Sequence, residues 1–188
     1  MRIFLIALFC AGVLATQASA GIITFTDTML GVNETPPNAS TATGSATVVL
    51  DTTLNTLNVS IVFSGLTGGV ASASHIHCCV PAGVVGIVAL PFTGFPATIS
   101  GTYSHLFDLT LLATYNGAFV TANGGTAASA EAALVAGLNA GLAYTNIHDT
   151  TFPGGEIRGQ LAAIPEPATM VLSGAGLLFA ALLRRHRR

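Results

Sequence analysis

The sequence predicts a mostly β protein, a Greek-key or immunoglobulin-like β-sandwich with one short helix. Short segments in which apolar and polar residues alternate recur along the chain, and Gly-rich turns separate them. Only one segment has a helical pattern. The two ends are apolar and differ in character from the middle, so we expect residues 21–163 to form the folded domain.

Each strand is predicted from its period of two. The clearest case is 57–63, where Leu57, Val59, Ile61 and Phe63 share one side. A Pro-Gly-Gly turn at 153–155 separates the last two strands. The predicted strands are 23–29, 45–50, 57–63, 73–79, 84–90, 102–112, 143–147 and 156–161.

The predicted helix covers residues 126–142. This segment is rich in Ala, and Leu134 and Leu138 are four residues apart, so they lie on one helix face. Either Thr126 or Ser129 can serve as its N-cap. We expect the helix to pack over one end of the sandwich.

The N-terminus, residues 1–20, has the pattern of a secretory signal peptide. A basic residue precedes twelve apolar residues at 3–14, and small residues stand at 18 and 20, before a cleavage site that would leave Gly21 first. The apolar run is too short for a comfortable membrane span. An uncleaved anchor is the alternative.

The C-terminus, residues 164–188, has three parts. Pro165, Glu166 and Pro167 precede an apolar stretch at 168–183, which predicts a transmembrane helix of about 24 Å. That length is short of the ~30 Å hydrocarbon core, and snorkelling of the flanking side chains would make up the difference. The alternative is a buried core helix. The basic tail consists of Arg184, Arg185, Arg187 and Arg188.

These three parts resemble the PEP-CTERM sorting signal of Gram-negative bacteria. The resemblance implies that exosortase, a membrane protease-transferase, processes the chain near the Pro-Glu-Pro sequence. It also implies a transient inner-membrane anchor and delivery to the cell surface or the extracellular polymeric matrix. The basic tail would stay in the cytoplasm.

The charge of the predicted domain is strongly acidic. Residues 21–163 carry seven carboxylates and one cation, Arg158, which gives a formal net charge of −6. This balance argues against binding to nucleic acid or to an anionic membrane surface. Arg158 shares a predicted strand face with Glu156, and we expect a local ion pair there or, alternatively, two solvated charges.

Three histidines form the candidate metal site. His75 and His77 are two residues apart on a predicted strand and therefore face the same way, and His148 ends another strand. Three imidazoles would suit Cu or Zn. The alternative is that these side chains hydrogen-bond loop backbone and hold strand ends together. His105 is expected to be a buried core histidine.

Cys78 and Cys79 are the disulfide candidates. They are the only cysteines of the predicted domain, and an oxidising compartment favours disulfides. Adjacent cysteines leave three options, namely a vicinal disulfide, cross-links between molecules, or thiolates bound to a metal.

The chain also resembles the CHRD domain, a module of chordin and of microbial secreted proteins. Segments 30–37, 43–46, 73–77 and 144–161 carry the resemblance, which extends over roughly 24–161. It implies an architecture like that of Cu/Zn superoxide dismutases, which also place two copper-binding histidines two residues apart. The further ligands of a bridged zinc site are missing here, so dismutase activity is not expected.

Together these observations predict a secreted or surface module with a structural or adhesive role and no enzymatic activity. The expected partners are exosortase and the membrane during sorting, then extracellular polysaccharide or surface proteins. No cofactor is required by this interpretation. The alternative is a Cu- or Zn-binding protein that uses His75, His77 and His148 in a redox or metal-scavenging role.

Overall fold

The computed structural model describes residues 21–165. The predicted signal peptide (1–20), the predicted transmembrane helix (168–183), the basic tail and two residues of the sorting motif, Glu166 and Pro167, lie outside this range. Within the described range, no helix is both long enough and apolar enough to cross a membrane.

Residues 21–165 form ten strands, two α-helices and two 3₁₀ turns, which confirms a mostly β protein. The strands are β1 (Ile22–Thr26), β2 (Met29–Leu30), β3 (Thr43–Asp51), β4 (Thr56–Ser64), β5 (Ala73–Cys78), β6 (Ile87–Pro91), β7 (Gly101–Asp108), β8 (Tyr144–His148), β9 (Ile157–Gln160) and β10 (Ala162–Ala163). The helices are α1 (Gly117–Ala122) and α2 (Ala127–Asn139), and the 3₁₀ turns are η1 (Gly31–Asn33) and η2 (Leu112–Thr114).

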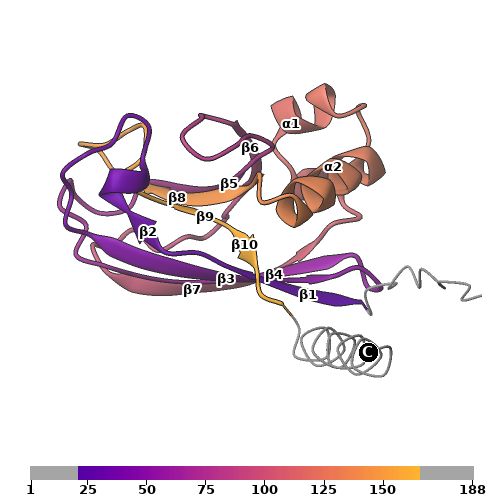
Figure 1. Cartoon of the computed structure of the whole chain (residues 1–188), viewed down its shortest axis with the longest axis horizontal. Helices are drawn as coiled ribbons and strands as arrows, with labels where there is room; N and C mark the ends of the chain where they lie inside the picture. Colours follow the sequence, from indigo (N-terminus) through magenta and orange to yellow (C-terminus); the bar gives the residue numbers. More distant parts are fainter. Residues whose placement is uncertain (1–20, 166–188) are drawn as a thin grey trace, which may run out of the picture.

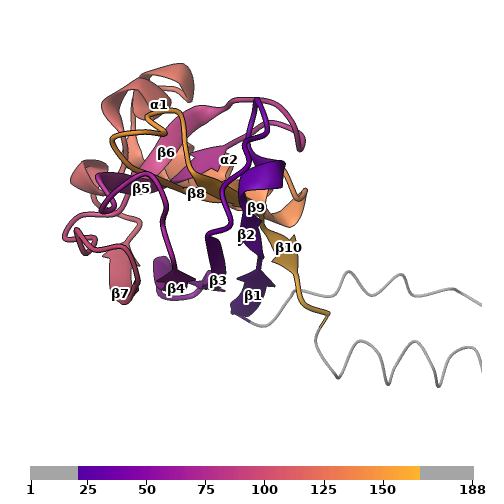
Figure 2. The ribbon, with the colours of Figure 1, turned by 90° about the vertical axis from the view of Figure 1, so that its left-hand side faces the viewer.

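The strands lie in two layers, as Figures 1 and 2 show. One layer runs β1-β3-β4-β7 and the other runs β9-β8-β5-β6, with every pairing antiparallel. Strand β2 pairs with both β3 and β9 and so joins the layers at one side. This arrangement agrees with a β-sandwich, while the immunoglobulin-like and superoxide-dismutase-like details stay predictions.

The apolar core fills the space between the layers. The side chains at 57, 59, 61 and 63 of β4 are all buried, as their alternation predicts. Ile76 and Ile147 face them from the other layer and are fully buried too. Burying each such side chain contributes roughly 1.5–3 kcal/mol, so the alternation fixes which face of every strand points inward.

Helix α2 matches the predicted helix, but the prediction of a single helix is wrong. Thr126 is the N-cap of α2, and its side chain and that of Ser129 form a reciprocal capping box. The missed helix, α1, has six residues and begins after Asn116, whose side chain accepts a hydrogen bond from Ala118. Six residues are too few to show a helical repeat. Figure 1 shows both helices at one end of the molecule, where α1 contacts β6 and α2 contacts β5 and β10.

His105 is exposed, so the prediction of a buried core histidine is wrong. Its neighbours at i−2 and i+2, Tyr103 and Phe107, are buried as expected. Strand β7 pairs only with β4 and forms an edge of its layer, so less of the structure covers its middle. The strand also ends at Asp108, which leaves Leu111 outside it and exposed.

Asp27 ties the two layers together. It interrupts the predicted strand 23–29 between β1 and β2, and one of its oxygens accepts a hydrogen bond from the Ala46 backbone N–H in β3 (2.8 Å). The other oxygen accepts from the Thr145 hydroxyl in β8, in the opposite layer. A Cβ atom at Gly159 would lie 2.6 Å from the Asp27 carboxyl carbon, so only Gly leaves room there. Burial raises the pKa of Asp27 to about 6, although these hydrogen bonds oppose the increase.

Asp27→Asn should therefore change how stability depends on pH. Because the folded-state pKa of Asp27 is raised, its contribution is greatest below the unfolded pKa near 4 and is lost as pH rises through about 6. Between pH 4 and 7 the wild type should lose about 2 kcal/mol relative to the variant, which cannot titrate there. Urea unfolding across this range measures the difference, and parallel curves for the two proteins would contradict the assignment.

Candidate metal centre

The register between β5 and β8 brings the three candidate histidines together. His75 and His77 project from the outer face of β5, while Ile76 between them points into the core. Asn146 of β8 lies directly opposite His75. His148 is two residues beyond Asn146 on the same face of β8, so it lies diagonally beside His75.

The three imidazoles converge. One ring nitrogen from each of His75, His77 and His148 lies within 4.8 Å of the others. The ring centroids of His75 and His148 are 5.1 Å apart, and those of His75 and His77 are 5.6 Å apart. In a tetrahedral site with bonds of about 2.0 Å the nitrogens would be roughly 3.3 Å apart. Small side-chain rotations therefore suffice to close the three rings on one ion.

Backbone carbonyls fix the protons of two rings. His77 Nδ1 lies 2.9 Å from the Gly86 carbonyl oxygen, and His148 Nδ1 lies 3.0 Å from that of Pro153. A carbonyl can only accept, so each Nδ1 donates its proton and each Nε2 keeps a free lone pair. Both Nε2 atoms are buried without a partner, as is Nδ1 of His75. Metal-binding histidines are usually held in this way, by a hydrogen bond at the nitrogen that does not bind the metal.

The three histidines are neutral at neutral pH. Burial lowers the pKa of each, and that of His75 falls to about 4, with the charges of His148 and His77 adding to the effect. The neutral imidazole is the form that binds metal, so no proton has to be removed.

Arg158 and Tyr144 extend the site toward β9. The Tyr144 ring is parallel to His77, with centroids 4.6 Å apart. The Arg158 guanidinium carbon lies 3.3 Å from the Tyr144 ring centroid. Because β8 lies between β5 and β9, His77 and Arg158 flank Tyr144 on its two faces. The stack fixes the orientation of the His77 ring.

The predicted ion pair between Glu156 and Arg158 is wrong. Strand β9 begins only at Ile157, and Glu156 turns away to accept hydrogen bonds from the backbone N–H and the hydroxyl of Thr67 (2.6 and 2.7 Å). Burial would raise the pKa of Glu156, but hydrogen bonds from Asp149 and these donors lower it to about 2. Burial and the neighbouring Glu156 carboxyl raise the pKa of Asp149. Asp149 Oδ1 accepts hydrogen bonds from the backbone N–H groups of Thr151 and Phe152, which holds the turn that follows His148.

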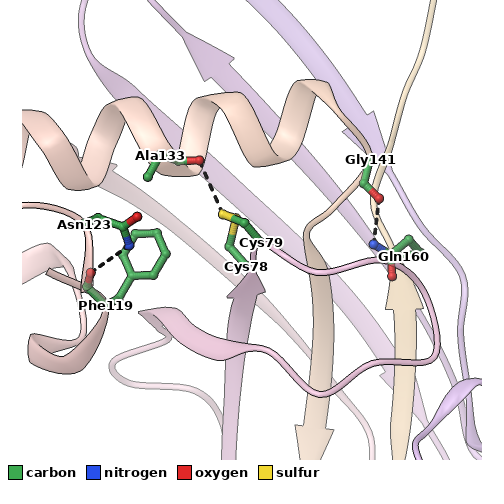
Figure 3. The surroundings of a disulfide bond; sticks show 7 residues. All are labelled: Cys78, Cys79, Phe119, Asn123, Ala133, Gly141 and Gln160. Carbon is green, nitrogen blue, oxygen red and sulfur yellow. Dashed lines mark hydrogen bonds between the residues drawn. A yellow bond between two sulfur atoms is a disulfide. The ribbon is translucent and has the colours of Figure 1, made fainter. Parts of the chain in front are cut away.

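Cys78 and Cys79 form a vicinal disulfide at the end of β5. Figure 3 shows it facing α2, where Cys79 Sγ lies 3.4 Å from the Ala133 carbonyl oxygen. Since Cys78 is an odd number of residues from both His75 and His77, its sulfur points to the opposite face of the strand. The sulfurs therefore do not belong to the histidine cluster, and the option of metal-bound thiolates has no geometric support.

Comparisons with known proteins agree with the sequence resemblances. The family model described as CHRD domain matches residues 25–161, and the model described as PEP-CTERM protein-sorting motif matches residues 163–188. Neither the curated proteins nor the solved structures contain a match.

Gly137→Ala should destabilise the domain. A Cβ atom on this α2 residue would lie 2.7 Å from Cys79 Sγ and even closer to Cys78 Sγ, and a disulfide cannot swing away as a flexible side chain can. Overpacking of this kind costs about 1–3 kcal/mol and should outweigh the helix propensity of Ala, which is worth about 1 kcal/mol. Urea unfolding of the oxidised protein measures the loss.

Gly117→Ala is the matched control, because a Cβ atom there meets nothing within 4 Å at the start of α1. It should leave stability unchanged or raise it slightly. If both variants had the same stability, close packing of α2 on the disulfide would be refuted.

Proposed function

The chain belongs to the CHRD domain family, and on that premise we propose that it is a non-enzymatic surface or matrix protein that binds one Cu or Zn ion through His75, His77 and His148. The PEP-CTERM motif implies export and exosortase-dependent sorting at the membrane to the cell surface. The ion-binding role and the place in the matrix are the proposal. A metal-scavenging or redox role would follow from the ion.

One observation carries the proposal, namely that each of three clustered histidines has a buried ring nitrogen without a hydrogen-bond partner, while one nitrogen from each ring lies within 4.8 Å of the others. A buried polar atom without a partner costs about 1–3 kcal/mol, so three at one position need an explanation. A cation supplies it, because all three lone pairs would become ligands. If the histidines contributed only to the fold, these three nitrogens would be expected to have partners too, as Nδ1 of His77 and Nδ1 of His148 do in the carbonyls of Gly86 and Pro153.

The ligand set favours copper or zinc. Imidazole nitrogen suits both ions, whereas calcium and magnesium prefer oxygen. Three protein ligands leave a fourth position for water or another small ligand. Among the described residues, no second group of three or more His, Cys, Asp or Glu side chains lies close enough together to hold another ion.

A structural or adhesive role without metal is the second candidate. The observation that favours it is that His77 and His148 hydrogen-bond backbone carbonyls in the two loops that follow β5 and β8. In that case the histidines would hold loops in place. The two candidates differ in whether the contribution of the histidines to stability depends on metal.

The first test is metal content. Purified after export and loaded with Cu²⁺ or Zn²⁺, the wild type should contain about one ion per chain by mass spectrometry, and a His75→Ala/His77→Ala variant should contain none. His105→Ala is the matched control and should bind as the wild type does, since His105 lies on β7, outside the cluster. A wild type without metal above background would contradict the proposal.

Stability then separates the two candidates. Metal at 100 times its dissociation constant should stabilise the wild type by about 2.7 kcal/mol and leave the double variant unchanged. If the double variant were less stable than the wild type by the same amount with metal present and with a chelator present, the histidines would contribute to the fold and not to metal binding.

A further inference from the structure

A cavity of about 660 Å³ opens between η1 and the loop that joins β5 to β6, with Arg158 in its lining. Its volume is in the range of small-molecule sites. None of the three candidate metal ligands lines it. The lining residues that matter here are Asn33, Glu34, Gly83, Arg158 and Gln160.

Arg158 is a buried cation with neutral partners. It is 2% exposed, yet its guanidinium donates to the Val84 carbonyl oxygen (2.7 Å) and the Thr35 hydroxyl (3.4 Å) and otherwise rests on Tyr144. Within residues 21–165, no carboxylate oxygen comes within 4.0 Å of it. Buried charges are normally paired, because their desolvation is costly. An anion in the cavity would supply the missing partner.

Glu34 does not fill that role. It is 5% exposed and close enough for the charge of Arg158 to act on it, but burial dominates and raises the pKa of Glu34 to about 7. At neutral pH, about half of the molecules therefore carry an uncharged carboxyl there, so Glu34 does not exclude an anion from the cavity.

Two residues that line the cavity carry a buried acceptor atom without a donor. Oε1 of Glu34 and Oε1 of Gln160 are both buried without a partner. The orientation of the Gln160 amide is fixed, because its nitrogen donates to the Gly141 carbonyl oxygen at 2.8 Å (Figure 3). Its oxygen can thus only accept. A ligand that satisfies both atoms must bring O–H or N–H groups.

We propose that this cavity binds a hydroxylated carboxylate of the uronic acid type, with its carboxylate on Arg158 and its hydroxyls donating to Glu34 and Gln160. A planar guanidinium matches a carboxylate, and hydroxyls match the two empty acceptors. The inference rests on the proposed function only for an extracellular location, and it does not require the metal.

The test is calorimetric titration of the exported chain, purified in mild detergent, with D-glucuronate as the probe. Glucuronamide and glucose, which keep the hydroxyls and lack the charge, should bind at least tenfold more weakly, and acetate, which lacks the hydroxyls, should be similarly weak. Arg158→Gln should lower glucuronate affinity at least tenfold. Gln160→Leu, which removes one acceptor, should lower it about threefold to tenfold.

Failure of this proposal is distinguishable from failure of the metal proposal. His148→Ala, which removes one candidate metal ligand and leaves the stack of His77, Tyr144 and Arg158 in place, should bind glucuronate as the wild type does, whether or not the wild type binds metal. No glucuronate binding by the wild type, or equal binding of glucuronate and glucuronamide, would overturn the carboxylate site. If Arg158→Gln does not fold, the wild-type comparison of ligands and Gln160→Leu still decide the matter.

Discussion

The antiparallel register of β5 against β8 is the constraint on which the candidate site depends. Because side chains alternate across a strand, this register sends Ile76 and Ile147 into the core and His75, His77 and His148 to the outer face. A slip of one residue would exchange the two sets and bury polar side chains among apolar ones. The free energy that drives core formation therefore also assembles the histidine cluster.

The outer face of this layer is polar, yet loops cover much of it. The loop after β5 supplies the Gly86 and Val84 carbonyls, which accept from His77 and Arg158, and the turn after β8 supplies the Pro153 carbonyl for His148. Because loops cover this face, the histidines are desolvated and their pKa is lowered, and Arg158 is almost fully shielded from solvent. Unpartnered atoms remain at the histidine cluster and beside the cavity, which is where ligands are proposed.

Sequence analysis could predict the parts of the site and not their assembly. Alternation placed His75 and His77 on one face, and it predicted the buried residues of β4 correctly. The carbonyls that orient the rings carry no sequence signal, because any residue at 86 or 153 offers one. Local spacing predicts a pair between Arg158 and Glu156, whereas tertiary packing turns Glu156 toward Thr67. The exposure of His105 depends on β7 being an edge strand, which no local pattern reveals.

X-ray absorption at the metal edge, recorded on the chain loaded with one Zn or Cu ion, would test the three-histidine site directly. We expect three imidazole nitrogens at about 2.0 Å, recognised by the multiple scattering of their rings, plus one oxygen ligand from solvent. Sulfur in the coordination shell, or fewer than two imidazoles, would contradict it and would separate the metal from the face on which β5 and β8 bring His75, His77 and His148 together.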